Sequence, residues 1–263
     1  MIGPLESLPV WGRAAVWGAL AGSGLLVGLI AAVITRPAHG KIARVMAFGA
    51  GALLGTVSMQ LIASAQEHAG IVVATVVILG GAVLFSIINV WLARAGAKNR
   101  KRCGECLPQE NERDKPGSGR AIAIGTIIDA LPEGLVLGIA VAQSVAPTIP
   151  VVAGFFLANV PESLSGSAGM YLAGRTKRYI VSVWVAASVV TPVAAGLASA
   201  FLAAASPMVA GILDALSGGI LLAIAVETMI PEAFDKAPLF SGTVAVLGFA
   251  IIAAVAALTS VSP

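Results

Sequence analysis

The chain contains eight apolar stretches of about 20 residues or more, separated by short polar connections. An α-helix needs about 20 apolar residues to cross a bilayer, so each stretch predicts one transmembrane helix. Hydrophobic residues make up 58% of the chain and charged residues 11%, against about a quarter charged in soluble domains. We therefore predict an all-α membrane protein of one domain, residues 1–263, with spans near residues 10–34, 42–64, 71–93, 121–142, 150–173, 180–203, 208–234 and 239–261.

The basic residues fall on one side of this predicted topology. Of the 16 Lys and Arg residues, all but Arg13 lie in or beside the connections after the first, third, fifth and seventh spans. Because basic loops stay in the cytoplasm, both termini are expected outside, with a flexible cytoplasmic loop at residues 94–120. Basic residues in short loops do not indicate nucleic-acid binding. We predict a multi-pass protein of a bacterial-type plasma (inner) membrane, in contact with the lipid bilayer.

Pairs of glycines four residues apart recur within the spans. Examples are Gly24 and Gly28, and Gly134 and Gly138. Small residues at this spacing allow membrane helices to approach closely, so we expect these pairs at helix contacts.

Carboxylates and an amide lie inside the fourth and fifth spans. Glu133 and Glu162 each lie 12 residues into their span, or about 18 Å along the helix axis. The two helices run in opposite directions, so both carboxylates should lie near the midplane. Asp129 shares a face with Glu133, and Asn159 shares a face with Glu162. If the two faces meet, three carboxylates and one amide converge.

Each of these glutamates follows a proline, Pro132 or Pro161. A proline leaves the carbonyl four residues earlier without its helical donor, which adds a possible oxygen ligand. Carboxylates in the membrane are costly and usually functional. No Lys or Arg lies deep in a span, so we expect no basic partner there and predict a cation or proton site. The alternative is that these groups only pair helices with one another.

These features resemble the ZIP (Zrt/Irt-like) family of divalent metal transporters. Asp129-Ala130-Leu131-Pro132-Glu133-Gly134 is similar to the family's His-Asn-x-Pro-Glu-Gly motif, and Asn159-Val160-Pro161-Glu162 is similar to its second motif. The resemblance implies two inverted three-helix repeats around spans four and five, a 3+2+3 arrangement with extracytoplasmic termini. It also implies a homodimer and a metal position formed by Asp129, Glu133, Asn159 and Glu162.

The chain departs from the family motif where ligand chemistry matters. Asp129 stands where the family usually has His, and Ala130, which cannot ligate, stands where it has Asn. Oxygen ligands suit harder cations than imidazole does. We therefore expect transport of zinc, the family default, or a shift toward manganese or iron; cadmium is a further candidate. A metal is expected as cargo, not as a cofactor.

Other polar residues suggest a path on either side of this position. Met59, Gln60 and Asp214, with Glu67 and His68, could form an entrance funnel, although a solvated helix end explains the same pattern. Glu227 and Glu232 could line an exit; because they are five residues apart, they should not share a helix face closely. The long loop also holds the pair Cys103 and Cys106, which is weak evidence for a metal site.

Two other functions fit parts of the pattern. An intramembrane hydrolase could use Asp129 and Glu133 as an acid pair, but Glu162 would then have no role and no nucleophile motif is present. A proton-coupled carrier of a non-metal solute would also use buried carboxylates. We favour a metal transporter that is not an enzyme.

Overall fold

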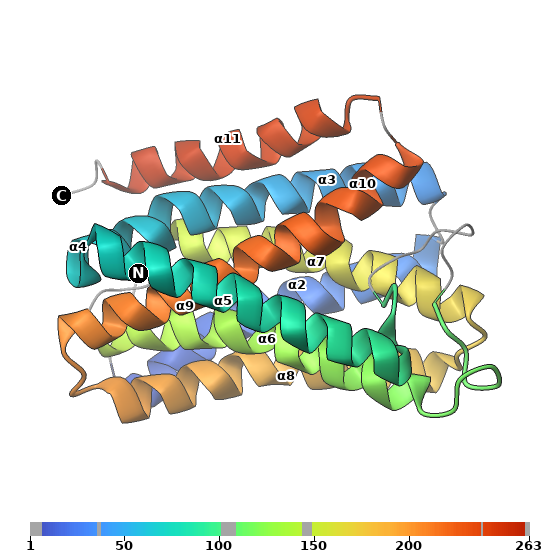
Figure 1. Ribbon diagram of the computed structural model, residues 1–263, viewed down its shortest axis with the longest axis horizontal. Helices are drawn as coiled ribbons and strands as arrows, with labels where there is room; N and C mark the ends of the chain where they lie inside the picture. The colour runs from blue at the N-terminus through green and yellow to red at the C-terminus, as the bar shows by residue number, and fades with distance from the viewer. Residues whose placement is uncertain (1–6, 36–37, 101–108, 144–148, 238, 261–263) are drawn as a thin grey trace.

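The computed structural model describes residues 7–35, 38–100, 109–143, 149–237 and 239–260, and in these ranges the regular structure is entirely helical (Figure 1). Three short π-helical segments, η1 to η3, continue neighbouring α-helices. The elements are α2 (Val10–Thr35), α3 (His39–Thr56), η1 (Val57–Leu61), α4 (Ile62–Ala69), α5 (Ile71–Leu92), η2 (Ala93–Ala97), α6 (Ser118–Ala142), α7 (Ile149–Leu172), α8 (Lys177–Leu202), α9 (Pro207–Ile224), η3 (Ala225–Met229), α10 (Ile230–Lys236) and α11 (Ser241–Ser260).

The helices fall where the apolar stretches predict spans. Seven of them are long and apolar enough to cross a membrane, counting α3 to α4, α5 to η2 and α9 to α10 as continuous rods. The remaining predicted span is helical too, as α7, but falls outside those seven. It carries Asn159, Glu162 and three serines, which lower its hydropathy. A helix buried among other helices can carry these polar groups because they do not face lipid.

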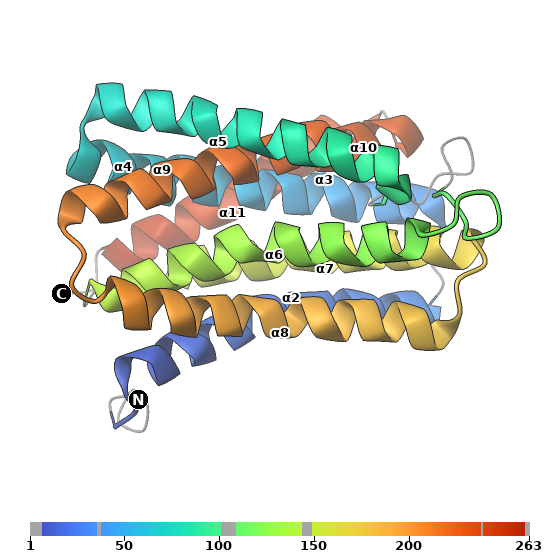
Figure 2. The ribbon, with the colours of Figure 1, turned by 60° about the horizontal axis from the view of Figure 1, so that its bottom comes forward.

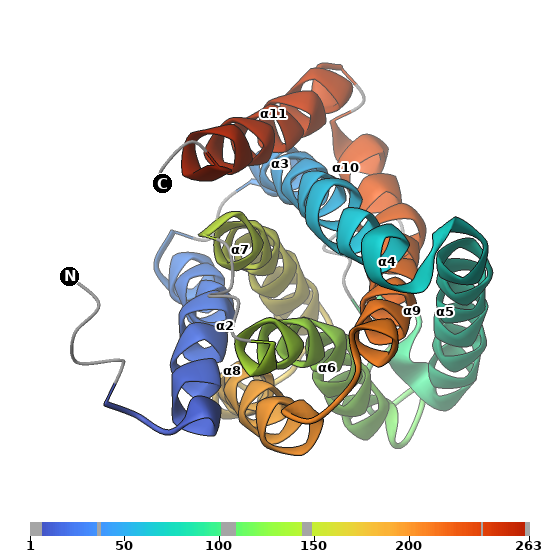
Figure 3. The ribbon, with the colours of Figure 1, turned by 90° about the vertical axis from the view of Figure 1, so that its left-hand side faces the viewer.

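The rods differ in how much protein surrounds them. In the most apolar part of α6, 67% of the residues are buried, against 17% in α5 and 11% in α11. The end-on view in Figure 3 shows α5 and α11 at the edge of the bundle. Helix α6 packs against α8, α2 and α9, and α7 packs against α2 and α3. The helices with the paired motifs therefore lie inside the bundle.

Glycines of the predicted pairs lie at close contacts between these helices, as their spacing predicts. A Cβ atom on Gly134 would lie 2.6 Å from the carbonyl oxygen of Thr191 on α8. A Cβ on Gly28 would lie 2.1 Å from the carbonyl oxygen of Val160 on α7. These backbone contacts leave no room for a larger residue.

The two ends of the bundle differ in character. Helix α2 begins and α11 ends at the same end, and the α5–α6 and α7–α8 connections lie at the opposite end (Figures 1 and 2). The second end carries Arg94, Lys98 and Arg175, and is called the basic end below.

An ion pair at the basic end connects the start of α6 to the α7–α8 turn. Arg175 Nη1 donates to Glu112 Oε2 over 2.7 Å, and the backbone N–H groups of Gly117 and Gly119 donate to the same carboxylate. Hydrogen bonding from Arg175, followed by that from the two backbone N–H groups, lowers the pKa of Glu112 from 4.5 to about 2. The ion pair should therefore remain ionised in moderate acid.

This lowered pKa makes the effect of a Glu112→Gln substitution dependent on pH. A group whose pKa is lower in the folded state stabilises the fold above its unfolded-state pKa. We expect a modest fall in the unfolding temperature at pH 7 that shrinks below pH 4.5 and disappears near pH 2. Thermal unfolding in detergent across this range measures the difference. A difference independent of pH would contradict the assignment.

Candidate metal site at the α6–α7 junction

The four predicted ligands are buried in the bundle. Asp129 and Glu133 on α6 are 4% and 5% exposed, and Asn159 and Glu162 on α7 are 3% and 8% exposed. Burying ionised carboxylates is expensive unless each has a partner. The hydrogen-bond and ion-pair partners of these side chains therefore indicate what chemistry they can support.

Asn159 connects the two motif helices. Its Nδ2 donates to Glu133 Oε2 over 2.8 Å and to the carbonyl oxygen of Ala21 on α2 over 3.3 Å. The faces carrying Glu133 and Asn159 therefore meet. Because the amide N–H groups point at Glu133 and Ala21, the amide orients the Glu133 carboxylate in this conformation.

Asp129 has a basic partner, contrary to expectation. Arg100 Nη2 lies 3.1 Å from Asp129 Oδ1 and 3.0 Å from Oδ2, and both side chains are almost fully buried. The prediction of no basic partner was wrong for Asp129, because it considered only residues within spans. Arg100 belongs to the α5–α6 connection, and the folding of this connection against α6 brings it inside.

Glu232 lies closer to the paired motifs than its place near a helix end suggests. It is 0% exposed, and its Oε1 accepts a hydrogen bond from Ser165 Oγ on α7 over 3.2 Å. Ser165 is three residues after Glu162, on the same face of α7. The wide turn of η3 and then Pro231 precede Glu232, and a π-helical segment changes the direction in which later side chains point.

Glu227 faces a different helix, as expected for residues five apart. It is exposed and accepts hydrogen bonds from Ser86 Oγ and from Asn89 Nδ2 on α5. Asn89 Oδ1 in turn accepts a hydrogen bond from Arg100 Nη1 over 2.7 Å. Asn89, Arg100 and Glu227 line a cavity of about 140 Å³ at the basic end.

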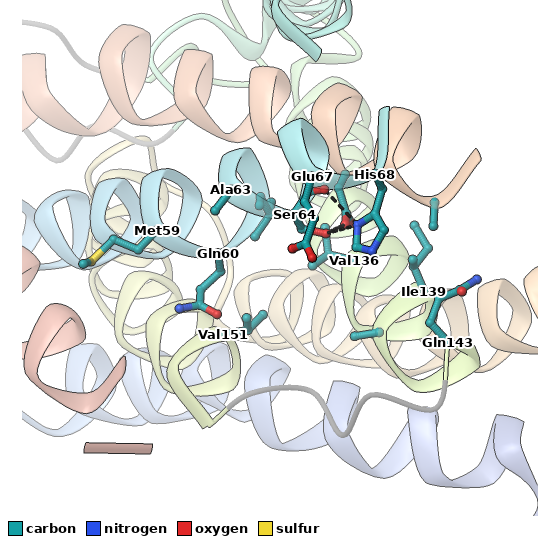
Figure 4. A pocket seen from close by; sticks show the side chains of 14 residues that line it. Met59, Gln60, Ala63, Ser64, Glu67, His68, Val136, Ile139, Gln143 and Val151 are labelled. Atoms are coloured by element: carbon teal, nitrogen blue, oxygen red, sulfur yellow. Dashed lines mark hydrogen bonds between the residues drawn. The ribbon is translucent and has the colours of Figure 1, made fainter. Parts of the chain in front are cut away.

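The predicted entrance residues surround a larger cavity at the opposite end, of about 500 Å³ (Figure 4). Met59, Gln60, Glu67, His68 and Asp214 all line it. The sequence did not single out Ser64, which donates to Asp214 Oδ2 over 2.7 Å and whose carbonyl oxygen lies 2.8 Å from His68 Nδ1. Val136 and Ile139 of α6 and Val151 of α7 also line this cavity, so it reaches the motif helices.

Within the described residues, no three His, Cys, Asp or Glu side chains are grouped closely enough to hold one metal ion. The ion pair of Asp129 with Arg100 and the hydrogen bond of Glu133 with Asn159 satisfy two of the predicted ligands in this conformation. Cys103 and Cys106 lie outside the described residues.

Seven helices of membrane-spanning length, with buried carboxylates on an interior helix of the bundle, are typical of integral membrane proteins that move ions or protons. The family model described as ZIP Zinc transporter matches residues 118–256, from the start of α6 into α11, which is more than half of the chain. The chain belongs to this family, so it is a multi-pass membrane transporter of divalent metals and not an enzyme. No individual curated protein matches the chain.

Proposed function

We propose that this protein is a divalent-metal permease of a bacterial-type plasma membrane, with Asp129, Glu133, Asn159 and Glu162 as its metal ligands. The contact between Asn159 and Glu133 carries this proposal, because it joins the two Pro-Glu helices through buried polar side chains. Glu162 lies three residues from Asn159 on the same helix face. Small rearrangements could therefore direct both glutamates toward one ion.

The donor types favour a harder metal than zinc. The four proposed ligands provide only carboxylate and amide oxygens, which suit manganese, whereas imidazole suits zinc and other late transition metals. The two histidines of the chain are His39, the first residue of α3, and His68, which lines the 500 Å³ cavity. Zinc can accept carboxylates, and iron and cadmium are the other candidate cargoes. We propose relaxed selectivity with a shift toward manganese or iron.

Uptake by proteoliposomes that contain the purified protein tests this selectivity. We expect Mn²⁺ or Fe²⁺ uptake at a rate comparable with or above that of Zn²⁺, because no imidazole favours the softer ion. Protein-free liposomes and liposomes with a Glu133→Ala variant serve as controls. Uptake of Zn²⁺ without Mn²⁺ or Fe²⁺ would contradict the shift, and no flux of any divalent metal would contradict the transport proposal.

The cavities at the two ends suggest where a metal ion enters and leaves the protein. The 500 Å³ cavity with Gln60, Met59 and Asp214 is the proposed entrance. Glu232 and Glu227 are the proposed exit residues, because one lies beside α7 and the other lines the cavity at the basic end. The basic end is proposed to face the cytoplasm, as the positive-inside rule requires.

The packing also supports the proposed 3+2+3 arrangement of two inverted repeats and a central pair. In this arrangement α2 corresponds to α8, α3 to α9, α5 to α11, and α6 to α7. Under this exchange the α2–α7 contact becomes the α8–α6 contact, and the α3–α11 contact becomes the α9–α5 contact. All four pairs are in contact, and the π-helical segments η1 and η3 interrupt corresponding rods. Inverted repeats commonly place a substrate site between them. A homodimer is proposed on the family resemblance.

A further inference from the structure

Arg100 is buried in the protein interior although it lies in the connection between α5 and α6. It comes three residues after η2, yet it is only 5% exposed. Its main chain is held by Gln109, whose Nε2 donates to the Arg100 carbonyl oxygen over 2.7 Å and lies 3.3 Å from the carbonyl oxygen of Gly166 on α7. The residue is therefore docked between α6 and α7.

Helix α6 provides a recess for the arginine side chain. Gly125 precedes Asp129 by one turn on the same face, and a Cβ atom there would lie 2.7 Å from Arg100 Nε and 2.9 Å from its Cδ. Because α6 begins at the basic end, Asp129 lies one turn closer to that end than Glu133. The guanidinium group lies between Asp129, which Nη2 contacts, and Asn89, which accepts from Nη1. Arg100 and Asn89 both line the 140 Å³ cavity.

The guanidinium group and a divalent metal compete for the same oxygens. A single nitrogen, Nη2, contacts both oxygens of Asp129, and Nη1 is used for Asn89. A metal bound to Asp129 would repel the arginine at close range. A guanidinium group left buried without its carboxylate is strongly unfavourable, so it would have to move toward water. Glu227 lines the adjacent cavity and offers it a second carboxylate.

We propose that Arg100 is a tethered cation that occupies the Asp129 position of the metal site and closes it from the basic end. Docking of Arg100 and binding of metal at Asp129 are mutually exclusive. Metal binding releases the arginine and so opens a passage from the metal site to the 140 Å³ cavity. When the arginine docks again, it displaces the metal toward that cavity. Because only the undocked form binds metal at Asp129, the apparent dissociation constant for metal rises in inverse proportion to the undocked fraction. This inference depends on the proposed metal site.

Metal affinity of the full-length protein in detergent, measured calorimetrically with MnCl2 and with ZnCl2, tests the inference. An Arg100→Gln variant should bind metal at least about fivefold more tightly, the lower range of typical coupling between sites. Arg94→Gln removes the same charge from an exposed position in η2 and should leave affinity unchanged. In an Asp129→Asn background, the Arg100→Gln substitution should produce no gain, because the competition acts through Asp129.

A purely structural ion pair gives a different pattern. In that case Arg100→Gln leaves metal affinity unchanged or weakens it, and this result would overturn the inference. Gly125→Ala provides a second variant, which keeps the arginine but fills its recess, and it should also tighten binding. If the wild-type protein binds metal in a Glu133-dependent manner and neither variant tightens it, the tethered-cation role fails while the proposed function stands. If the wild-type protein binds no metal, both fail.

Discussion

Replacing Glu133 or Glu162 with alanine is expected to lower the rate of metal uptake by at least about 100-fold. Loss of a residue that only supports a metal ligand costs about 10–100-fold in affinity or activity, and loss of a direct ligand should cost more. Both glutamates are buried, and Glu133 is oriented by Asn159. As a proposed ligand, each glutamate would supply a negative charge that a divalent cation needs in place of its hydration shell. Stopped-flow metal uptake by proteoliposomes measures this loss.

A binding measurement separates loss of the site from loss of the fold. Metal at 100 times its dissociation constant stabilises a protein by about 2.7 kcal/mol, so the wild-type unfolding temperature should rise with metal. This rise should disappear in Glu133→Ala and Glu162→Ala. Asp114→Ala removes the same charge from an exposed position in the α5–α6 connection that lines neither end cavity and should keep the rise. A normal metal-dependent rise in Glu133→Ala would exclude Glu133 as a ligand.

Substituting alanine for Gly81 is expected to disrupt the packing of α5 on α9. A Cβ atom at this position would lie 2.3 Å from the backbone carbonyl oxygen of Leu216. Because a backbone atom cannot rotate away, the helices must separate, at a cost of about 1–3 kcal/mol for overpacking. The unfolding temperature in detergent should therefore fall.

The neighbouring glycine provides a matched control. A Cβ atom on Gly80 would meet nothing within 4 Å, so Gly80→Ala should be neutral or should stabilise the helix by up to about 1 kcal/mol. The two substitutions add the same methyl group to the same helix at consecutive positions. Equal unfolding temperatures for the two variants would show that close α5–α9 contact is not required.

The sequence determined the helices and the identity of the motif residues. Hydropathy over about 20 residues is a local property, so the apolar stretches predicted the positions of the rods closely. Helical periodicity is also local, and it correctly predicted that Glu227 and Glu232 face different neighbours, α5 and α7 respectively. The motif around Pro132 and Glu133 indicated the ZIP family, and the family match over residues 118–256 confirmed it.

Only the tertiary structure decided which side chains meet. Arg100 reaches Asp129, Ser165 reaches Glu232 and Ser64 reaches Asp214 across 29, 67 and 150 residues of chain, respectively. Such contacts depend on how loops fold back and how helices rotate against each other, and no local pattern encodes either. For Arg100 the consequence is largest: a residue that the sequence places in a basic loop is folded into the proposed metal site, because burying its charge requires a carboxylate partner and Asp129 is within reach.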